Sequence, residues 1–285
     1  MKSPVVNFAP PTKMTDRYAV IGYPVAHSRS PEIHAAFARE CGVDIQYERL
    51  LATPAGFVAT VDAFRNSGAS GANVTLPFKL EAFAYVSEHT ARAARGGSVN
   101  TLSFESNRIL GDNTDGAGLC RDIVQNIGQS LQGARILLIG AGGAARGVVG
   151  ALLDCQPETL AITNRTATKA ELIVAEFGTQ KSLCAIGLAA LHSQRFDILI
   201  NATSASLTAS LPLVPISSFN KNALAYDMMY GKGLTPFLAL AASTGARTAD
   251  GLGMLVEQAA EAFYVWRGVR PSTGPVINLL KKNAS

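Results

Sequence analysis

Segment 71–79, G-A-N-V-T-L-P-F-K, ends in a lysine, a residue type that can donate a proton in general acid catalysis. Side chains alternate between the two faces of a strand, so Asn73 and Thr75 share one face of a predicted strand end. Pro77 then forces a turn, and Lys79 follows within reach. Open α/β sheets bind ligands at the carboxyl ends of strands, although Lys79 alone also suits a surface lysine.

Two further polar segments follow, S-V-N-T at 98–101 and G-D-N-T-D-G at 111–116. Taken singly, Asn100 is typical of a turn and Asp115 of a helix N-cap. Together with Lys79 they offer an ammonium, a carboxylate and amide groups. This combination suits a ligand that carries several hydroxyl groups.

The loop 22–31, G-Y-P-V-A-H-S-R-S-P, leads into a predicted helix. Pro31 suits the first helical position and Ser30 the N-cap, so Ser28 and Ser30 lie where backbone amides can hold an anion. A substrate carboxylate fits this place. A helix cap without a ligand explains the same residues equally well.

Gln258 lies on the apolar stripe of a predicted C-terminal helix, together with Leu255, Ala259, Ala262 and Trp266. A buried amide needs hydrogen-bond partners, so this side chain either meets backbone groups or reaches into a cleft. The sequence leaves both possibilities open.

Residues 134–145, A-R-I-L-L-I-G-A-G-G-A-A, form a second chemical motif. The apolar run suits a buried parallel strand, and Gly140 permits the tight turn after it. Gly142 lets the backbone approach a phosphate, and Ala145 lets the next helix pack closely. Because another strand is predicted at 159–163, at the spacing of a βαβ unit, the motif predicts dinucleotide binding.

The end of the strand 159–163 indicates which dinucleotide binds. An NAD site places Asp or Glu there for the ribose 2′-hydroxyl, whereas this chain has Asn164, Arg165 and Thr166, with Lys169 one turn further. A guanidinium pairs with a 2′-phosphate that a carboxylate would repel, so we expect NADP. The alternative is a helix start with Thr166 as N-cap and Arg165 as a solvated charge.

Strands and helices alternate along the chain, which predicts an α/β fold with parallel sheets. Strands are expected at 18–21, 45–51, 71–76, 98–104, 108–111, 136–139, 159–163, 183–186, 196–200, 223–227 and near 247. Helices are expected at 31–41, 55–66, in segments up to 95, at 116–127, from 166 to 177, at 235–243 and finally at 254–267.

The length of 285 residues exceeds what one α/β core usually needs. We expect a flexible tail at 1–16, an N-terminal α/β substrate-binding and catalytic domain at 17–115, and a Rossmann-type, doubly wound NADP domain at 116–250. The C-terminal helical segment, 251–285, is expected to return to the first domain and pack on it.

Composition places the chain among globular proteins. Hydrophobic residues make up 48% and charged residues 16%, which is enough apolar material for sizeable cores. The net charge is +4 without a dense basic run, so nucleic acid is not an expected partner. The uncharged stretch 198–220 contains polar residues and two prolines, so no membrane span is expected.

The four cysteines, Cys41, Cys120, Cys155 and Cys184, are far apart and have no histidine at metal-ligand spacing. We expect four buried thiols in a reducing cytoplasm and no metal site. Residues 1–16 hold three prolines and no apolar segment of the kind that a secretory signal needs.

In order along the chain, these segments resemble the shikimate/quinate dehydrogenase family, from about Asp16 onward. The resemblance rests on the loop 22–31, the segments 71–79, 98–101 and 111–116, the turn G-A-G-G-A-A-R-G, and the downstream N-R-T, N-A-T-S, Y-D-M-M-Y and A-D-G-L-G-M-L-V-E-Q. It implies NADPH-dependent, reversible reduction of 3-dehydroshikimate to shikimate. It also implies a small-molecule substrate, two domains with a cleft between them, and a cytoplasmic monomer or homodimer.

The resemblance also implies roles for individual residues, with Lys79 and Asp115 as the catalytic pair. The implied substrate-binding residues are Ser28, Ser30, Asn73, Thr75, Lys79, Asn100, Asp115, Tyr230 and Gln258. The implied cofactor-binding residues are Gly140, Ala141, Gly142, Gly143, Ala144, Asn164, Arg165, Thr166, Lys169, Met228 and Gly251. The family often has arginine where Lys169 stands, and lysine cannot offer a bidentate fork to the 2′-phosphate.

Two other functions stay open at this point. A quinate/shikimate dehydrogenase that uses NAD differs only in selectivity, which one Asn-Arg-Thr segment does not fix. A non-catalytic NADP-sensing module would keep the glycine-rich turn but has no need for both Lys79 and Asp115. In an enzyme, Lys79 would supply the proton as hydride reaches a ketone, and it is expected to titrate with Asp115 as one coupled unit.

Overall fold

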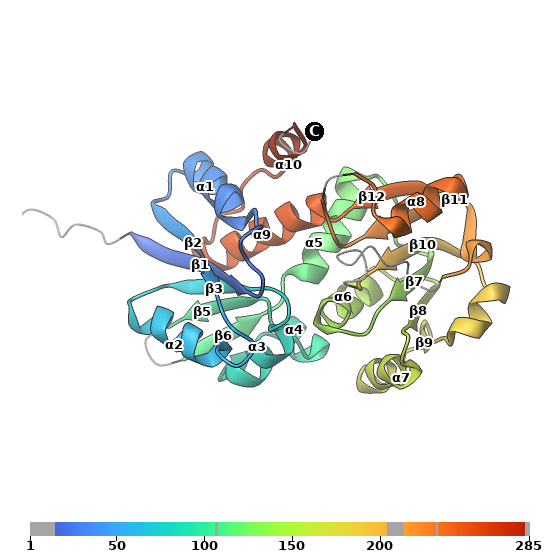
Figure 1. The fold of residues 1–285 in the computed structure, drawn as a ribbon, viewed down its shortest axis with the longest axis horizontal. Coiled ribbons are helices and arrows are strands. Elements are labelled where there is room, and N and C mark those ends of the chain that lie inside the picture. The colour runs from blue at the N-terminus through green and yellow to red at the C-terminus, as the bar shows by residue number, and fades with distance from the viewer. Residues whose placement is uncertain (1–14, 106–107, 204–213, 232, 283–285) are drawn as a thin grey trace, which may run out of the picture.

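The computed structural model describes residues 15–105, 108–203, 214–231 and 233–282. It consists of two lobes, each built around a six-stranded sheet (Figure 1). Of the expected flexible tail, residues 1–14 lie outside the described residues, as do 106–107 at the tip of the expected hairpin.

The first sheet has the strand order β2-β1-β3-β5-β6-β4. Its strands are β1 (Asp16–Gly22), β2 (Ile45–Leu51), β3 (Gly71–Val74), β4 (Glu88–His89), β5 (Thr101–Phe104) and β6 (Ile109–Asp112). The first three strands run parallel, and β5 runs antiparallel to both of its neighbours. The carboxyl ends of β1, β2 and β3 therefore meet at one edge of the sheet.

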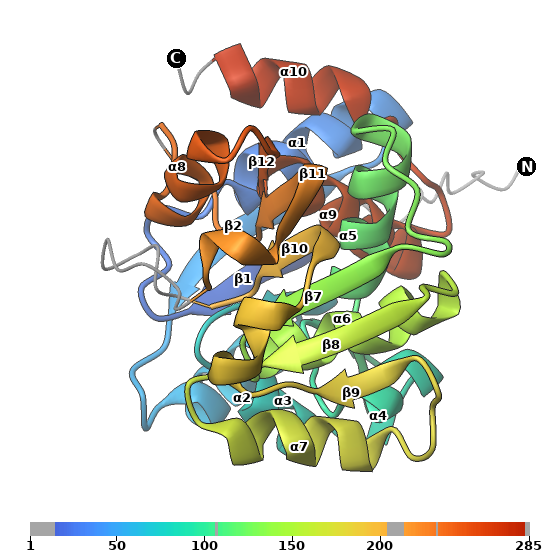
Figure 2. The same cartoon turned by 90° about the vertical axis from the view of Figure 1, so that its right-hand side faces the viewer.

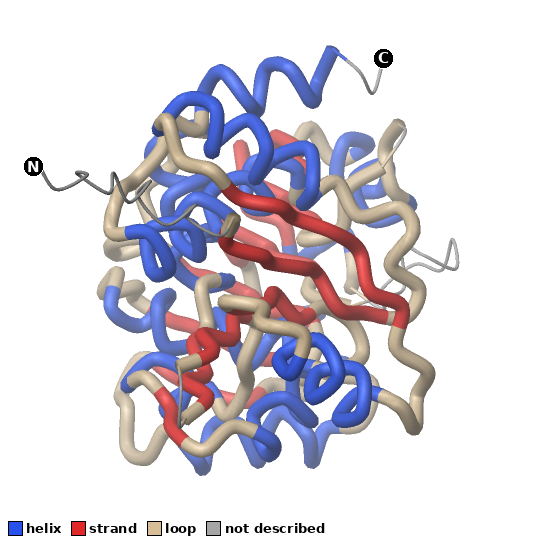
Figure 3. Tube along the Cα trace, turned by 90° about the vertical axis from the view of Figure 1, so that its left-hand side faces the viewer, coloured by secondary structure: helices blue, strands red, loops and turns tan. Residues whose placement is uncertain are grey.

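Helices cover both faces of this sheet, as the view from the first lobe shows (Figure 3). They are α1 (Ser30–Cys41), α2 (Phe57–Asn66), α3 (Lys79–Tyr85) and α4 (Ala91–Gly96). Because side chains alternate along a strand, Ala19 and Ile21 of β1 pack against α2. On the other face, Phe37 of α1 packs in a second core with residues near the C-terminus.

The second sheet is wholly parallel, with the order β12-β11-β10-β7-β8-β9 (Figure 2). Its strands are β7 (Arg135–Ile139), β8 (Thr159–Thr163), β9 (Leu183–Ala185), β10 (Phe196–Asn201), β11 (Phe219–Asp227) and β12 (Arg247–Asp250). The main helices are α6 (Gly143–Asp154), α7 (Ala167–Glu176) and α8 (Pro236–Ser243). This is the doubly wound order of Rossmann folds, which confirms the predicted fold class.

Two helices link the lobes: α5 (Asp115–Arg121), which continues into a π-helical turn at Asp122–Asn126, and α9 (Leu252–Arg267). As predicted, the C-terminal segment returns to the first lobe, where α9 packs against α1. The expected helix at 116–127 is not regular, because its last turn is π-helical. In this turn the Asp122 carboxylate accepts hydrogen bonds from Asn126 and from Tyr226 of β11.

The helix expected at 254–267 does end at Arg267, but the expectation that it is the last helix is wrong, because α10 (Gly274–Lys282) follows it. This short helix buries Val276, Ile277 and Leu280 against the core around α1 and α9. Its apolar stripe is real but spans only nine residues, which is too short for a strong periodic signal.

The prediction of four buried thiols is also wrong. All four cysteines are free, but Cys184 is exposed and Cys41, Cys120 and Cys155 are half-buried. Cys184 lies in the middle of β9, which is an edge strand of the second sheet. Neighbouring side chains of an edge strand point alternately into the protein and toward solvent, so apolar neighbours do not guarantee burial.

Candidate active site

Lys79 and Asp115 are brought together from two elements of the first lobe. Lys79 begins α3 and Asp115 begins α5, and the Lys79 Nζ lies 2.5 Å from the Asp115 Oδ2. Their side chains are only 13% and 5% exposed, so this ion pair is largely shielded from water. Lys79 is therefore not a surface lysine, and the N-cap of α5 is Thr114 rather than Asp115.

Asn100 connects this pair to the helix that returns from the second lobe. Its Nδ2 donates to Asp115 Oδ1 at 2.9 Å and lies 3.3 Å from Gln258 Oε1. The Gln258 Nε2 donates to the backbone carbonyl of Leu255 at 2.8 Å. One end of the Gln258 amide therefore meets the backbone, as one of the two possibilities required, and the other end faces Asn100.

Asn73 lies beneath Asn100 at the end of β3 and is 6% exposed. Its Nδ2 donates to the Asn100 carbonyl at 3.3 Å and to the Thr101 hydroxyl at 3.1 Å. Thr75 follows directly, and its backbone N–H donates to the Ile21 carbonyl of β1 at 2.9 Å. The Asn73 side chain therefore lies at the end of β3, and Thr75 follows one residue after the strand ends at Val74.

Ser28 and Ser30 lie together at the start of α1. The Ser28 hydroxyl donates to the Ser30 hydroxyl at 3.1 Å, and the Arg49 guanidinium holds the Ser28 carbonyl at 2.6 and 2.8 Å. The prediction that Ser30 is the N-cap is wrong, because α1 begins at Ser30 and Arg29 occupies the cap position. Burial raises the pKa of Tyr230, against an opposing hydrogen bond with the Arg29 backbone, so this side chain of the second lobe reaches the serine loop.

The glycine-rich turn lies next to the catalytic lysine. Gly140 has φ +117°, a conformation that other residues rarely adopt, and Gly142 is the N-cap of α6. A Cβ added to Gly142 would meet no heavy atom of the described residues within 4 Å, whereas one added to Gly143 would lie 3.1 Å from the Lys79 Cβ. The turn is therefore open to a ligand on one side and adjoins Lys79 on the other, while Ala141 and Ala144 beside it are half-buried.

The residues after β8 present two cations to solvent. Arg165 and Lys169 are exposed, and within the described ranges neither forms an ion pair. Thr166 is the N-cap of α7, and Asn164 Nδ2 donates to its carbonyl at 2.9 Å. Helix capping therefore leaves both cations, Arg165 and Lys169, exposed.

Met228 and Gly251 lie at the carboxyl ends of β11 and β12, on the same edge of the sheet as the glycine-rich turn. A Cβ on Gly251 would collide with the Met228 carbonyl, so only glycine permits this close backbone approach. The Gly251 N–H donates to the Met229 carbonyl at 3.0 Å.

Three residues that the sequence analysis did not identify contact the predicted site residues or one another. Tyr47 donates to Asn73 Oδ1 at 2.7 Å, His34 stacks on Tyr47 at a ring separation of 4.2 Å, and Arg49 holds the serine loop. Tyr47 and Arg49 alternate along β2, which indicates that they share a face, but the sequence does not show that Asn73 shares that face.

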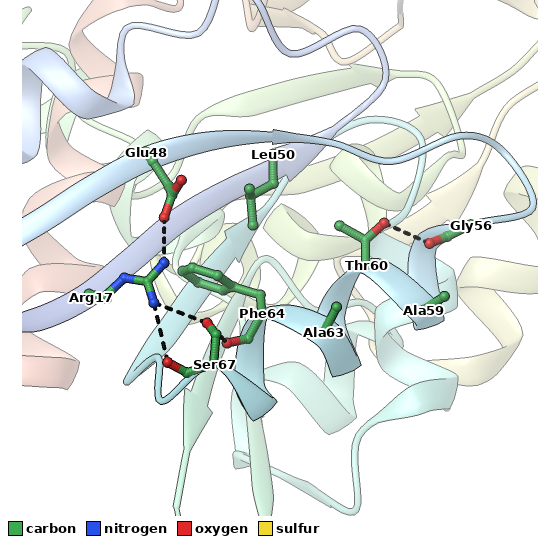
Figure 4. A pocket seen from close by; sticks show the side chains of 9 residues that line it. All are labelled: Arg17, Glu48, Leu50, Gly56, Ala59, Thr60, Ala63, Phe64 and Ser67. Carbon is green, nitrogen blue, oxygen red and sulfur yellow. Dashed lines mark hydrogen bonds and ion pairs between the residues drawn. The ribbon is translucent and has the colours of Figure 1, made fainter.

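A surface hollow of about 560 Å³ lies on the opposite face of β2, between this strand and α2 (Figure 4). Its one arginine, Arg17, is paired with Glu48 and Ser67. None of the predicted site residues lines this hollow. Within the described residues, no group of His, Cys, Asp and Glu is arranged to hold a metal ion, and no helix has the length and apolarity to cross a membrane.

Three family models match the chain in order. They describe a shikimate dehydrogenase substrate binding domain at residues 20–102, a shikimate/quinate 5-dehydrogenase at 122–212 and a shikimate 5′-dehydrogenase C-terminal domain at 251–281. Among solved structures, an enzyme from Pseudomonas putida is 48% identical with a TM-score of 0.87, covering 93% of this chain and 98% of its own. A shikimate 5-dehydrogenase from Thermus thermophilus, solved with NADP(H) and shikimate, is 32% identical with a TM-score of 0.83, covering 95% and 100%.

Curated relatives agree with these models. The shikimate dehydrogenase (NADP(+)) of Nitrosospira multiformis is 56% identical over 271 residues, which cover 95% of this chain and 98% of the relative. The enzyme of the same name from Aromatoleum aromaticum is 54% identical, covering 94% and 97%. The chain therefore belongs to the shikimate dehydrogenase family.

Proposed function

We propose that this protein catalyses the NADP-dependent, reversible reduction of 3-dehydroshikimate to shikimate. The observation that carries the proposal is the shielded Lys79–Asp115 pair, which lies beside Gly143 of the glycine-rich turn. A proton donor from one lobe thereby adjoins the dinucleotide motif of the other. The relatives named for this reaction and this cofactor support the same activity.

The residues present fit NADP rather than NAD. The start of the 12-residue helix α6 offers free backbone N–H groups, and the space in front of Gly142 is open. The chain has Asn164 where an NAD site has an acid, and Arg165 and Lys169 are exposed beside it. Residues 140–144 would hold the pyrophosphate, residues 164–169 the 2′-phosphate, and Met228 and Gly251 would border the nicotinamide.

The first lobe fits a small, hydroxylated carboxylate. Ser28 and Ser30 would bind the substrate carboxylate at the start of α1, with Tyr230 reaching the same loop from the second lobe. The ring hydroxyls and the pocket wall would be held by Asn73, Thr75, Asn100, Asp115 and Gln258. Amides and carboxylates read hydroxyl groups well, because together they both donate and accept.

Bound NADPH would supply the hydride to the carbonyl carbon. Lys79 would donate a proton from Nζ to the carbonyl oxygen as negative charge develops there. Asp115 orients the ammonium and, in the oxidative direction, helps to receive the proton, so the two groups act as one coupled unit. The shielding of both side chains strengthens their charge interaction.

The division of labour between the segments is part of the proposal. Residues 17–115 would form the substrate-binding and catalytic domain, 116–250 the NADP domain, and 251–285 the C-terminal segment, whose described part packs on the first domain. The family resemblance further supports a monomer or homodimer that acts in the cytoplasm on a small-molecule substrate.

An absorbance assay at 340 nm tests the proposal. With shikimate and NADP⁺ the protein should form NADPH. The value of kcat/KM should fall at least tenfold when quinate replaces shikimate, and also when NAD⁺ replaces NADP⁺. A higher kcat/KM with quinate and NAD⁺ would identify the other branch of the family instead. A folded protein that binds NADP⁺ but forms no NADPH with either substrate would be a sensing module.

A further inference from the structure

Tyr47 lies in the middle of β2, outside every motif discussed above. In the parallel register it pairs with Tyr18 of β1, so the two tyrosines share the face covered by α1 and α9. Their hydroxyl groups have different environments. The Tyr47 hydroxyl meets Asn73 Oδ1 at 2.7 Å, whereas the Tyr18 hydroxyl meets the Arg267 guanidinium at 3.5 Å.

The direction of the hydrogen bond from Tyr47 is fixed by its neighbours. The backbone carbonyl of Asn100 only accepts, so the Asn73 amide must turn its nitrogen toward Asn100 and its oxygen toward Tyr47. A carboxamide oxygen only accepts, so the phenol must donate. The second N–H of Asn73 is directed to the Thr101 hydroxyl at 3.1 Å.

The same directionality continues to the catalytic pair. With its oxygen occupied by Asn73, the Thr101 hydroxyl donates to Asn100 Oδ1 at 2.8 Å, which also accepts from the Thr114 backbone N–H at 2.9 Å. The Asn100 nitrogen is therefore turned toward Asp115 Oδ1. Every amide in this chain of contacts has one allowed orientation, and Tyr47 is the donor at its start.

We propose that Tyr47 is a positioning residue for the reaction described above, acting through Asn73 and Asn100 on the Asp115–Lys79 pair. The inference rests on the proposed function and deepens it. Without the phenolic O–H, the Asn73 oxygen loses the hydrogen bond that it accepts at 2.7 Å, and a buried acceptor that loses its donor favours rotation of the amide. Rotation would direct an amide oxygen at the Asn100 carbonyl and disturb the groups expected to hold the substrate.

The surroundings of Tyr47 keep the phenol a fixed donor. His34 is fully buried and stacks on it with an angle of 7° between the rings, and Trp266 lies 6.5 Å from it on the same side of the sheet. Burial raises the pKa of Tyr47, against a hydrogen bond with Ser30, so the phenol keeps its proton. Stacking holds the ring in place, and neither ring nitrogen of His34 is hydrogen-bonded among the described residues.

The variant Tyr47→Phe removes the donor and keeps the ring, and Tyr18→Phe is its matched control. Tyr18 is 3% exposed and stacks on Trp266 at 4.4 Å, so its variant loses a buried tyrosine hydroxyl from the same layer. We expect Tyr47→Phe to lower kcat/KM for shikimate about tenfold while the KM for NADP⁺ stays within about twofold. Tyr18→Phe should leave both constants within about twofold of wild type.

A double-mutant cycle with Asn73→Ala separates positioning from general destabilisation. If Tyr47 acts through Asn73, Tyr47→Phe should change kcat/KM by less than about twofold in the Asn73→Ala background. Equal effects of Tyr47→Phe in both backgrounds, or equal losses in Tyr47→Phe and Tyr18→Phe, would overturn the proposal.

A readout that needs no turnover separates this inference from the proposed function. In protein labelled with ¹⁵N-asparagine, the side-chain amide signals of Asn73 and Asn100 should shift in Tyr47→Phe and stay in place in Tyr18→Phe. An inactive wild type with these shifts would refute the proposed reaction but keep the positioning role. Unchanged amide signals in Tyr47→Phe would refute the positioning role, whatever the activity.

Discussion

The polar groups of the two lobes differ in how they are held before any ligand arrives. In the first lobe, Asn73, Asn100 and Asp115 are nearly buried and bonded to one another, with Asp115 also paired to Lys79. In the second lobe, Arg165 is exposed and forms no ion pair with the described residues.

This difference indicates that the first lobe is arranged to catalyse the reaction and the second lobe to bind the cofactor phosphate. A reacting carbon needs groups that are already oriented, because reorganisation during the reaction raises the barrier. A phosphate needs only charge and free N–H groups, which exposed cations and a helix start provide. Substitutions in the first lobe should therefore change turnover, and those in the second should change cofactor binding.

The largest effect is expected for Lys79→Met, which removes the ammonium and keeps an unbranched chain. Loss of a positioned acid should lower kcat about 10²- to 10⁴-fold, because the proton transfer is made in the transition state. Shikimate affinity, measured by calorimetry, should stay within a few-fold of wild type. The exposed lysine variant Lys181→Met is the control, and a nearly unchanged kcat would reduce Lys79 to a binding group.

A smaller and more selective effect is expected for Arg165→Ala. Loss of an exposed guanidinium that pairs with the 2′-phosphate should lower kcat/KM for NADP⁺ about tenfold and leave kcat/KM for NAD⁺ unchanged. The loss should shrink at high salt. The control is Arg195→Ala. Arg195 is exposed and lies before the amino end of β10, at the opposite end of the parallel strands, so this variant should change neither constant. Equal losses for both cofactors would show that Arg165 does not read the phosphate.

The smallest effect is expected on the free energy of unfolding, and it comes from the buried His34 of the first lobe. Burial lowers the pKa of His34 to about 3, against an opposing contact with Asn73, whereas the unfolded chain binds this proton near pH 6.5. The stabilisation from His34 is therefore complete above pH 6.5 and is lost as the pH falls toward 3. Between these limits the loss is about 1.4 kcal/mol per pH unit.

The variant His34→Met keeps a similar volume without a titrating group and isolates this contribution. Guanidinium unfolding at pH 7, 5.5 and 4.5 should show a steeper fall of stability in wild type than in the variant. Parallel slopes would mean that His34 takes up its proton in the folded state. The comparison between the two proteins cancels the carboxyl groups that both contain.

The sequence predicts much of the second lobe because its signals are local. The buried run before Gly140, the turn and the helix after it are consecutive, and each residue type has one clear physical reason. The residues around Arg165 follow the next strand directly. A short stretch of chain therefore contains the whole motif, and its structure agrees with the prediction.

The first lobe is less predictable because its site depends on strand register. Asn73 and Lys79 belong to one short segment, so the sequence predicts that they lie close together. Tyr47 reaches Asn73 only because β1 lies between β2 and β3, which the sequence does not show. Nothing in the sequence of β2 reports its neighbours, and a shift of one residue would turn Tyr47 to the other face. The helix cap predicted at Ser30 lies one residue earlier, at Arg29, for a related reason, since local capping signals do not show the turn that precedes them.

The helix α9 belongs to two hydrophobic cores at once. Met254 lies in the core of the second lobe, while Val256 and Phe263 lie in the core that also holds Phe37. Disorder in one lobe therefore removes a wall from the other, which couples their melting into a single cooperative event. A fragment that stops before residue 251 would expose Phe37 and its neighbours to water, so neither half of this chain is an independent folding unit.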